Sequence, residues 1–269
     1  MAYAPMYEIW RTVVGETVFE VALDLGHGED YPLKSHPWFF GVRIPMTNKN
    51  ADGLPSEEEA ERLDAVENRV REVAKQRDGI YVGRRQGLGN RDLLLYFPKR
   101  PTGLDDRIRA SMGTELLFIS RDDAAWKGYE QLLPGPREWR RIEDGRIIAK
   151  LLEQNADPKA EHAVMHRVST SIQKGAEALM ELMKKLELDD IQTVGKKPDL
   201  VVCGVQRTAL DPDNLLKVSF VLESKAEKAR GKYLGWLAEP VGEGGGAINA
   251  IDDLDFDDES LDFDIEDEA

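Results

Sequence analysis

The chain has 269 residues, of which 41% are hydrophobic, and a formal net charge of −15 at pH 7. This length predicts one large or two ordinary domains, and the single cysteine, Cys203, excludes a disulfide within the chain. No apolar run approaches the roughly 20 residues of a membrane helix and the first residues lack a signal-peptide pattern, so we expect a cytoplasmic protein without a membrane segment.

The first half of the chain has the alternation of apolar and polar residues that is typical of strands. β-Branched and aromatic residues on both sides of Gly15-Glu16 predict a hairpin over 7–24. Further strands are predicted over 38–44, 79–85, 92–97 and 115–120, and residues 98–114 are expected to be irregular. The segment Gln86-Gly87-Leu88-Gly89-Asn90 is interpreted as a hairpin turn, because it lacks the strand-to-helix setting of a phosphate loop.

One helix is predicted with its start defined by capping residues. Ser56 can cap the first turn, and Glu59 can complete a reciprocal capping box. The acids that follow Ser56 also favour the positive end of the helix dipole. One apolar face then follows at helical spacing: Leu63, Val66, Val70 and Val73. The first half therefore predicts an antiparallel sheet with one helix lying across it.

The second half has a different order of elements. Helices are predicted over 139–154 and 171–187 and strands over 162–169, 190–194 and 200–206. The segment after Asp211 fits either a strand or a helix and favours a helix, and Gly231–Trp236 leads into a last strand. We expect domains over 1–137 and 138–241, followed by a glycine-rich linker and acidic tail over 242–269.

Three blocks of the second half are distinctive: GRIIAKLLEQNADP at 145–158, the strand beginning at His162, and GKYLGW at 231–236. With these blocks the second half resembles the bacterial regulator of ribonuclease E activity B. Leu234 stands where that family usually has an aspartate. The resemblance implies a ferredoxin-like α+β fold without an active site, which lowers the activity of a ribonuclease by protein–protein contact.

The first half resembles the uncharacterised domain of unknown function 695. Its matching pieces are HPWFFGVRIPM at 36–46, DGLPSEEEAERLDAVE at 52–67 and the strand that ends LLLYF at 93–97. The connector at 122–139 resembles the segment that joins the two domains in proteins that carry both. We therefore predict two small α+β domains, each an antiparallel sheet with helices on one face, the second ferredoxin-like, followed by a disordered acidic tail.

Three groups of residues are candidates for chemistry. His162 and His166 have a spacing that would suit two metal ligands, but zinc sites need three or four, and no further ligand motif accompanies the pair. His27, flanked by glycines and close to acids, is a candidate catalytic loop histidine. Cys203 lies in an apolar run, which favours a buried and unreactive thiol. We expect no catalytic residue, metal or cofactor, and a hydrolase that uses these histidines stays an alternative.

Tyr233 and Trp236 are large amphipathic rings beside glycines. Such rings most often fill the edge of a core, but aromatic side chains also anchor protein interfaces. We predict both residues as partner-binding residues and keep the core as the alternative.

The last 18 residues hold 11 of the 51 acidic residues and none of the 36 basic ones, so residues 1–251 carry a net charge of only −4. The tail also contains an LDFD near-repeat, in which Leu254, Phe256, Leu261, Phe263 and Ile265 are spaced among the acids. Burying each such side chain contributes about 1.5–3 kcal/mol. We predict these five as partner-binding residues. A solubilising tail and docking onto basic residues of this chain, such as Lys225, Lys228, Arg230 and Lys232, are the alternatives.

These observations favour a non-enzymatic regulator that binds a protein partner, such as a ribonuclease or another nucleic-acid enzyme with a basic groove. The nearly balanced body argues against direct binding of nucleic acid. A second hypothesis is an immunity or antitoxin-like protein that neutralises a basic toxin.

Overall fold

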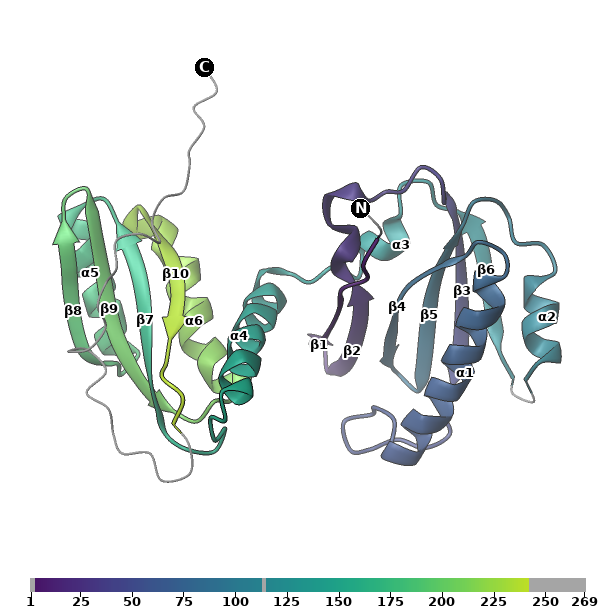
Figure 1. Cartoon of the computed structure of the whole chain (residues 1–269), viewed down its shortest axis with the longest axis horizontal. Helices are drawn as coiled ribbons and strands as arrows, with labels where there is room; N and C mark the ends of the chain where they lie inside the picture. Colours follow the sequence, from purple (N-terminus) through teal and green to yellow (C-terminus); the bar gives the residue numbers. More distant parts are fainter. Residues whose placement is uncertain (1–2, 113–114, 242–269) are drawn as a thin grey trace, which may run out of the picture. The chain divides into compact units, whose positions relative to one another are not determined.

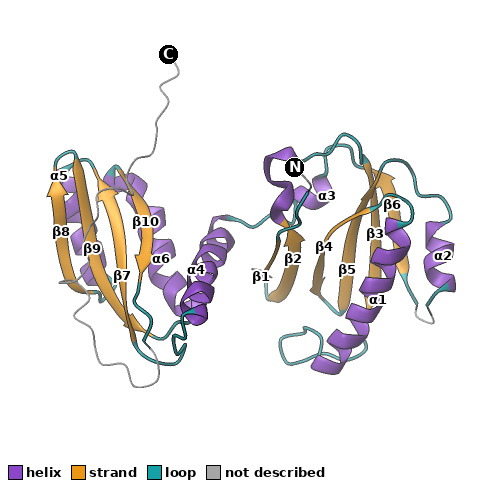
Figure 2. Ribbon diagram, in the orientation of Figure 1, coloured by secondary structure: helices purple, strands orange, loops and turns teal. Residues whose placement is uncertain are grey.

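The computed structural model describes residues 3–112 and 115–241, and the chain divides after Ile142 into two compact units. Each unit is built on one antiparallel sheet, of six strands in the first and four in the second, with helices packed against it (Figures 1 and 2). The predicted α+β class is therefore confirmed. Within the described ranges, no helix combines the length and apolar character that crossing a membrane requires. The predicted tail lies outside the described residues.

The sheet of the N-terminal unit has the order β1-β2-β4-β5-β3-β6, and every neighbouring pair is antiparallel. Its strands are β1 (Tyr7–Val14), β2 (Thr17–Asp24), β3 (Trp38–Pro45), β4 (Ile80–Gly87), β5 (Asn90–Phe97) and β6 (Leu117–Asp122). All five predicted strand regions occur, including the hairpin. Leu88 and Gly89 form the predicted β4–β5 turn, and both have the positive φ that a two-residue hairpin turn demands.

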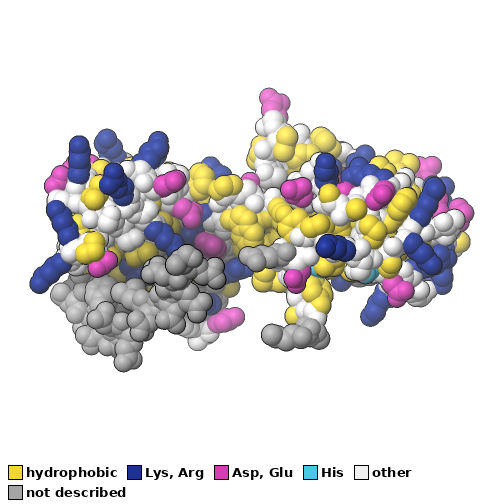
Figure 3. All heavy atoms as spheres, turned by 90° about the horizontal axis from the view of Figure 1, so that it is seen from above, with side chains coloured by type: hydrophobic (Ala, Val, Ile, Leu, Met, Phe, Trp, Pro, Cys, Tyr) yellow, Lys and Arg dark blue, Asp and Glu magenta, His cyan; other side chains and the backbone are white. Residues whose placement is uncertain are grey.

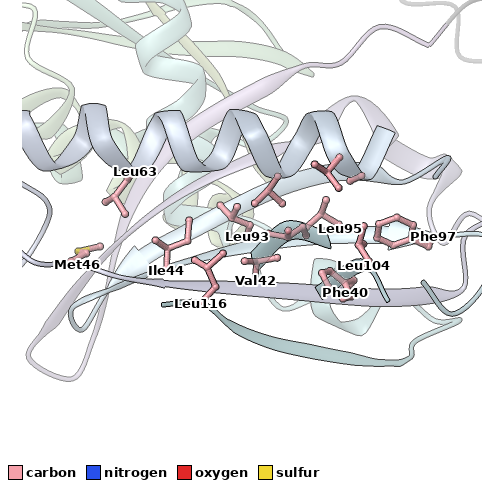
Figure 4. Packing of buried hydrophobic residues seen from close by; sticks show 14 residues of the cluster. Phe40, Val42, Ile44, Met46, Leu63, Leu93, Leu95, Phe97, Leu104 and Leu116 are labelled. Atoms are coloured by element: carbon pink, nitrogen blue, oxygen red, sulfur yellow. The ribbon is translucent and has the colours of Figure 1, made fainter. Parts of the chain in front are cut away.

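Helix α1 (Glu57–Lys75) lies across one face of this sheet, as predicted (Figure 4). The Ser56 hydroxyl caps it by accepting a hydrogen bond from the Glu59 amide at 3.3 Å. Leu63 points down from the helix toward Ile44 and Leu93 on the strands, and all three side chains are fully buried. This apolar layer, rather than helix propensity, provides most of the stability of such a helix.

The reciprocal half of the predicted capping box is not formed. The Glu59 carboxylate instead accepts hydrogen bonds from the Thr47 amide at 2.8 Å and from the Arg62 guanidinium at 2.9 Å, while the Ser56 amide donates to the Asn48 carbonyl. Arg62 and Thr47 together lower the pKa of Glu59 to about 2. The Thr47 amide and the Arg62 guanidinium therefore bond the Glu59 carboxylate in place of the Ser56 amide, which is the donor that a capping box predicts.

Residues 98–114 are not irregular throughout, because Leu104–Ala110 form helix α2. Leu104 and Ile108 are one turn apart and both fully buried in the same core as α1. The helix begins after Gly103, which has a left-handed φ of 70° and provides no side-chain cap. Seven residues are too few to show helical periodicity, and packing of these two side chains stabilises the helix instead.

The opposite face of the sheet carries a second core cluster centred on Trp126. The Trp126 ring stacks on Tyr96 of β5 with ring centroids 4.1 Å apart, and its indole N–H donates to the His36 carbonyl at 2.8 Å. Residues of η1 (Leu25–Asp30) and α3 (Lys127–Glu130) complete this layer. The predicted connector is thus part of the core of the N-terminal unit.

The C-terminal unit has a βαββαβ order that follows helix α4. The elements are α4 (Pro136–Glu153), β7 (His162–Thr170), α5 (Gln173–Lys185), β8 (Asp189–Lys196), β9 (Asp199–Thr208), α6 (Pro212–Ala226), η2 (Glu227–Ala229) and β10 (Gly231–Leu237). The strand order β10-β7-β9-β8, antiparallel throughout, is that of a ferredoxin-like sheet. This confirms the predicted fold, and the ambiguous segment after Asp211 is the helix α6.

The two faces of this second sheet differ. Helices α5 and α6 cover one face, where Leu179 and Leu222 pack with Val202 of β9. The other face, which we name the open face, carries a smaller apolar cluster to which only strands contribute. It consists of buried Met165, Cys203 and Val205 with partly buried Ala163, Val194 and Val201.

Candidate functional site

His27 is buried in η1 among aromatic rings. Its ring stacks on Tyr3, with centroids 4.7 Å apart, and its Nε2 lies 3.1 Å from the Tyr3 hydroxyl and 4.0 Å from Asp24 Oδ2. The Tyr3 hydroxyl donates to Asp24, whose other oxygen accepts from the amides of Met6 and Gly26. The network therefore attaches residues 3–6 to the start of η1.

Burial keeps the rings of this network uncharged. Burial lowers the pKa of His27, and burial together with the Asp24 carboxylate raises the pKa of Tyr3 above its ordinary value. Both rings are therefore neutral near pH 7. The His27 ring is buried and packs edge-on against Trp126, which gives it a packing role in this core, while the hydrolase hypothesis stays untested.

We expect His27 to make the protein less stable as the pH falls below about 6.5. Burial lowers the pKa of His27 in the folded state, so the unfolded chain binds the proton more readily. The stabilisation is fully present above the pKa of the unfolded state. It is lost as the pH falls toward the pKa of the folded state. An NMR titration of the ring should give a pKa below 6.5. The His27→Gln variant should show a flatter decline in unfolding free energy between pH 7 and 5, and an unchanged decline would contradict the expectation.

His162 and His166 are both fully buried in β7, where the ring nitrogens of each lie close to polar atoms of the protein. The ring nitrogens of His162 lie 2.8 and 3.3 Å from the carbonyl oxygens of Asp157 and Glu239. Those of His166 lie 2.8 Å from the Tyr233 hydroxyl and 3.0 Å from Gln206 Oε1. Across residues 3–112 and 115–241, no cluster of three or more His, Cys, Asp or Glu side chains could hold a metal ion.

Tyr233 and Trp236 both lie inside the C-terminal unit. Tyr233 belongs to the core beneath α5 and α6, and Trp236 is only 1% exposed. The Trp236 indole N–H donates to Asp144 Oδ1 of α4 at 2.8 Å, and Asp144 Oδ2 accepts from the Ser219 hydroxyl of α6 at 2.6 Å. Burial thus gives both rings a packing role, while their predicted contact with a partner stays untested.

Asp144 is the residue of this unit that sequence reasoning missed. It is fully buried and connects α4, α6 and β10 through one carboxylate. One of three acids in the helix over 139–154, it gives no sign of this role in the sequence, because its partners follow 75 and 92 residues later.

Two segments of the chain match known protein families. Residues 141–237 match the family described as Regulator of ribonuclease activity B. Residues 7–133 match the Family of unknown function (DUF695). Both predicted resemblances are therefore confirmed, in the predicted order. A comparison with curated proteins found no match to the chain.

A groove on the regulator-family unit, the unit that holds residues 141–237, has a basic rim. It lies between α5 and α6, holds about 280 Å³, and has Leu179 and Leu182 on its wall. Lys185, Lys225 and Lys228 surround it, and two of these are among the lysines predicted as a docking surface for the tail. The groove can accept an acidic segment, although its apolar wall is small.

A larger pocket lies on the N-terminal unit, whose surface carries exposed apolar side chains beside basic ones (Figure 3). It holds about 420 Å³ on β3, β5 and β6, next to α3. Arg43 and Arg85 both bond the single carboxylate of Asp92, at 2.6 and 3.1 Å, and Arg121 lies over the Phe39 ring. Three guanidinium groups against one carboxylate make this pocket basic.

The tail residues predicted to bind a partner lie outside the described residues. They are Leu254, Phe256, Leu261, Phe263 and Ile265.

Proposed function

We propose that this protein is a cytoplasmic, non-enzymatic regulator that binds a ribonuclease or another nucleic-acid enzyme and lowers its activity. The observation that carries the proposal is the match of residues 141–237 to the regulator family, together with a ferredoxin-like fold around a fully packed core. The buried histidines and tyrosine of this unit bond one another and the backbone, which accords with a binding role rather than a catalytic one.

The concentration of acidic residues in the tail supports binding through the tail. The acidic tail concentrates 11 carboxylates in 18 residues of an otherwise nearly balanced chain. A nuclease needs a basic channel to hold the phosphates of RNA, and an acidic segment can occupy that channel in place of RNA. In this proposal the five apolar tail residues add contact area once the carboxylates have brought the tail to the channel.

We expect the full-length protein to inhibit RNA cleavage by purified ribonuclease E, the enzyme that the resemblance implies, and a protein ending at Ala250 to inhibit weakly or not at all. Inhibition should weaken steeply between about 0.1 and 1 M salt, because the screening length falls from about 10 to 3 Å. The measurement is the cleavage rate of a labelled RNA at several salt concentrations.

The matched control keeps the charge of the tail and replaces Leu261, Phe263 and Ile265 with serine. If inhibition is electrostatic with an apolar contribution, this variant should keep the salt dependence and bind less tightly than the full-length protein. Equal inhibition at low salt by the full-length protein and the protein ending at Ala250 would show that the tail is not the inhibitory segment.

A further inference from the structure

The open face of the regulator-family unit is buried without a described layer above it. Met165, Cys203 and Val205 are only 4%, 1% and 2% exposed. Comparable burial on the other face comes from α5 and α6, whereas the open-face cluster draws on β7, β8 and β9 alone. Side chains on a sheet face become this inaccessible when a second layer covers them. A layer that covers this cluster would have to come from outside the described helices and strands.

A partly buried arginine on the same face indicates the chemistry of that cover. Arg167 faces Cys203 directly in the β7–β9 register, and its Nε atom is buried without a hydrogen-bond partner. A buried N–H without an acceptor is costly, and a carboxylate is the strongest acceptor for a guanidinium N–H. Arg207 of β9, two positions beyond Val205 on the same face, already pairs with Asp189 and Asp190 at 3.5 and 3.8 Å. The covering segment should thus combine apolar side chains with carboxylates.

We propose that residues 254–266 of this chain cover the open face. In an extended segment Leu261, Phe263 and Ile265 lie on one side, where they match the apolar strip of Met165, Cys203 and Val205. The acids between and beside them supply a carboxylate for Arg167. No other stretch of the sequence outside the described residues has both properties.

The tail begins close to the start of β7, one of the strands that form the open face. The last described residue, Val241, is bonded through its carbonyl to the Asp157 amide, which precedes β7. From Val241 to Leu254 an extended chain reaches roughly 40 Å, whereas four strands span roughly 15 Å. Because the segment is attached to the unit it covers, its effective concentration is high and weak contacts suffice to hold it. A partner that takes the tail would then have to compete with this sheet.

Cys203 provides a direct test, because it is the only cysteine of the chain and lies at the centre of the open face. Burial raises the pKa of its thiol, which slows its reaction with thiol reagents further. We expect a disulfide reagent such as dithiobis-nitrobenzoate to modify the native full-length protein slowly. A protein ending at Ala250 should react at least about tenfold faster, because the covering layer is gone.

One further variant and one peptide-addition experiment keep the test decisive if truncation changes the rate for another reason. Replacing Leu261, Phe263 and Ile265 together with serine should accelerate modification and leave the circular dichroism spectrum unchanged. Adding a synthetic peptide of residues 252–269 to the truncated protein should slow modification again. The proposal does not rest on the proposed function, since no ribonuclease is present in these measurements.

Three other outcomes would contradict the proposal that residues 254–266 cover the open face. Equal rates for the full-length and truncated proteins would mean that residues 254–266 do not cover Cys203. Acceleration only when the chain is shortened to Val241 would assign the cover to residues 242–250. Protection that disappears on dilution would assign it to a second copy of the chain.

Discussion

Replacing Glu67 with alanine is expected to lower the free energy of unfolding of the N-terminal unit by about 3 kcal/mol. Glu67 is buried on α1, where its carboxylate accepts from the Tyr81 hydroxyl at 2.7 Å and from Arg91 Nη1 at 3.1 Å. Arg91 is only 1% exposed. The variant would leave the buried Arg91 guanidinium and the Tyr81 hydroxyl without the Glu67 acceptor. The half-exposed Asp64 still bonds Arg91, which keeps the loss of unfolding free energy near the lower limit for a broken buried ion pair.

The matched control is Glu72→Ala on the same helix. Glu72 also pairs with an arginine, Arg69 at 2.9 Å, but both side chains are exposed, so the change should stay within about 0.5 kcal/mol. Hydrogen exchange of the β4 and β5 amides in the full-length protein reports on this unit alone, which a global unfolding curve of two units does not. Equal effects of the two substitutions would mean that the Glu67 network is not coupled to the stability of the core.

Asp144→Ala is the second substitution with a large expected effect, again about 3 kcal/mol, and it acts on the regulator-family unit. It removes the acceptor of the Trp236 indole and of the Ser219 hydroxyl, and both donors are fully buried. Asp144→Asn keeps one carbonyl oxygen and should cost less. Hydrogen exchange of the β7 and β10 amides measures the loss.

A mutant cycle separates the hydrogen bonds of Asp144 from its other contacts. Ser219→Ala alone should cost about 1 kcal/mol, and in the Asp144→Ala background it should cost clearly less, because the bond is already gone. Purely additive losses would contradict the shared network. Trp236→Phe, which keeps most of the ring volume and removes the N–H, should couple to Asp144 in the same way.

Elements with a strong periodic pattern could be predicted from the sequence. The apolar stripe from Leu63 to Val73 and the capping serine predicted α1, and the alternation around Gly15 predicted the first hairpin. The ferredoxin-like order came from the resemblance rather than from periodicity. Helix α2 was missed because two buried side chains, not a pattern, hold it in place.

The interactions that join distant segments could not be predicted. Asp144 and Trp236, or Glu67 and Arg91, become neighbours only when the sheet forms, and nothing in either local sequence indicates the pairing. The same limit applies to Tyr233 and Trp236 as candidate partner residues. Strict alternation would place residues 233 and 236 on opposite faces of a strand. The register shift between Tyr233 and Gly235 places both on the face that the helices cover, and a shift of this kind cannot be predicted from the sequence.

The pairing order of the C-terminal sheet also sets when each unit can fold during synthesis. β10 is the last strand made, yet it pairs with β7, the first strand of its sheet, so that sheet stays incomplete until residue 237 has emerged. The N-terminal unit needs only the residues up to 142. At typical elongation rates of about 5–20 residues per second, the 95 residues from 143 to 237 take roughly 5–19 s to make. The N-terminal unit can therefore fold several seconds before the regulator-family unit can complete its sheet.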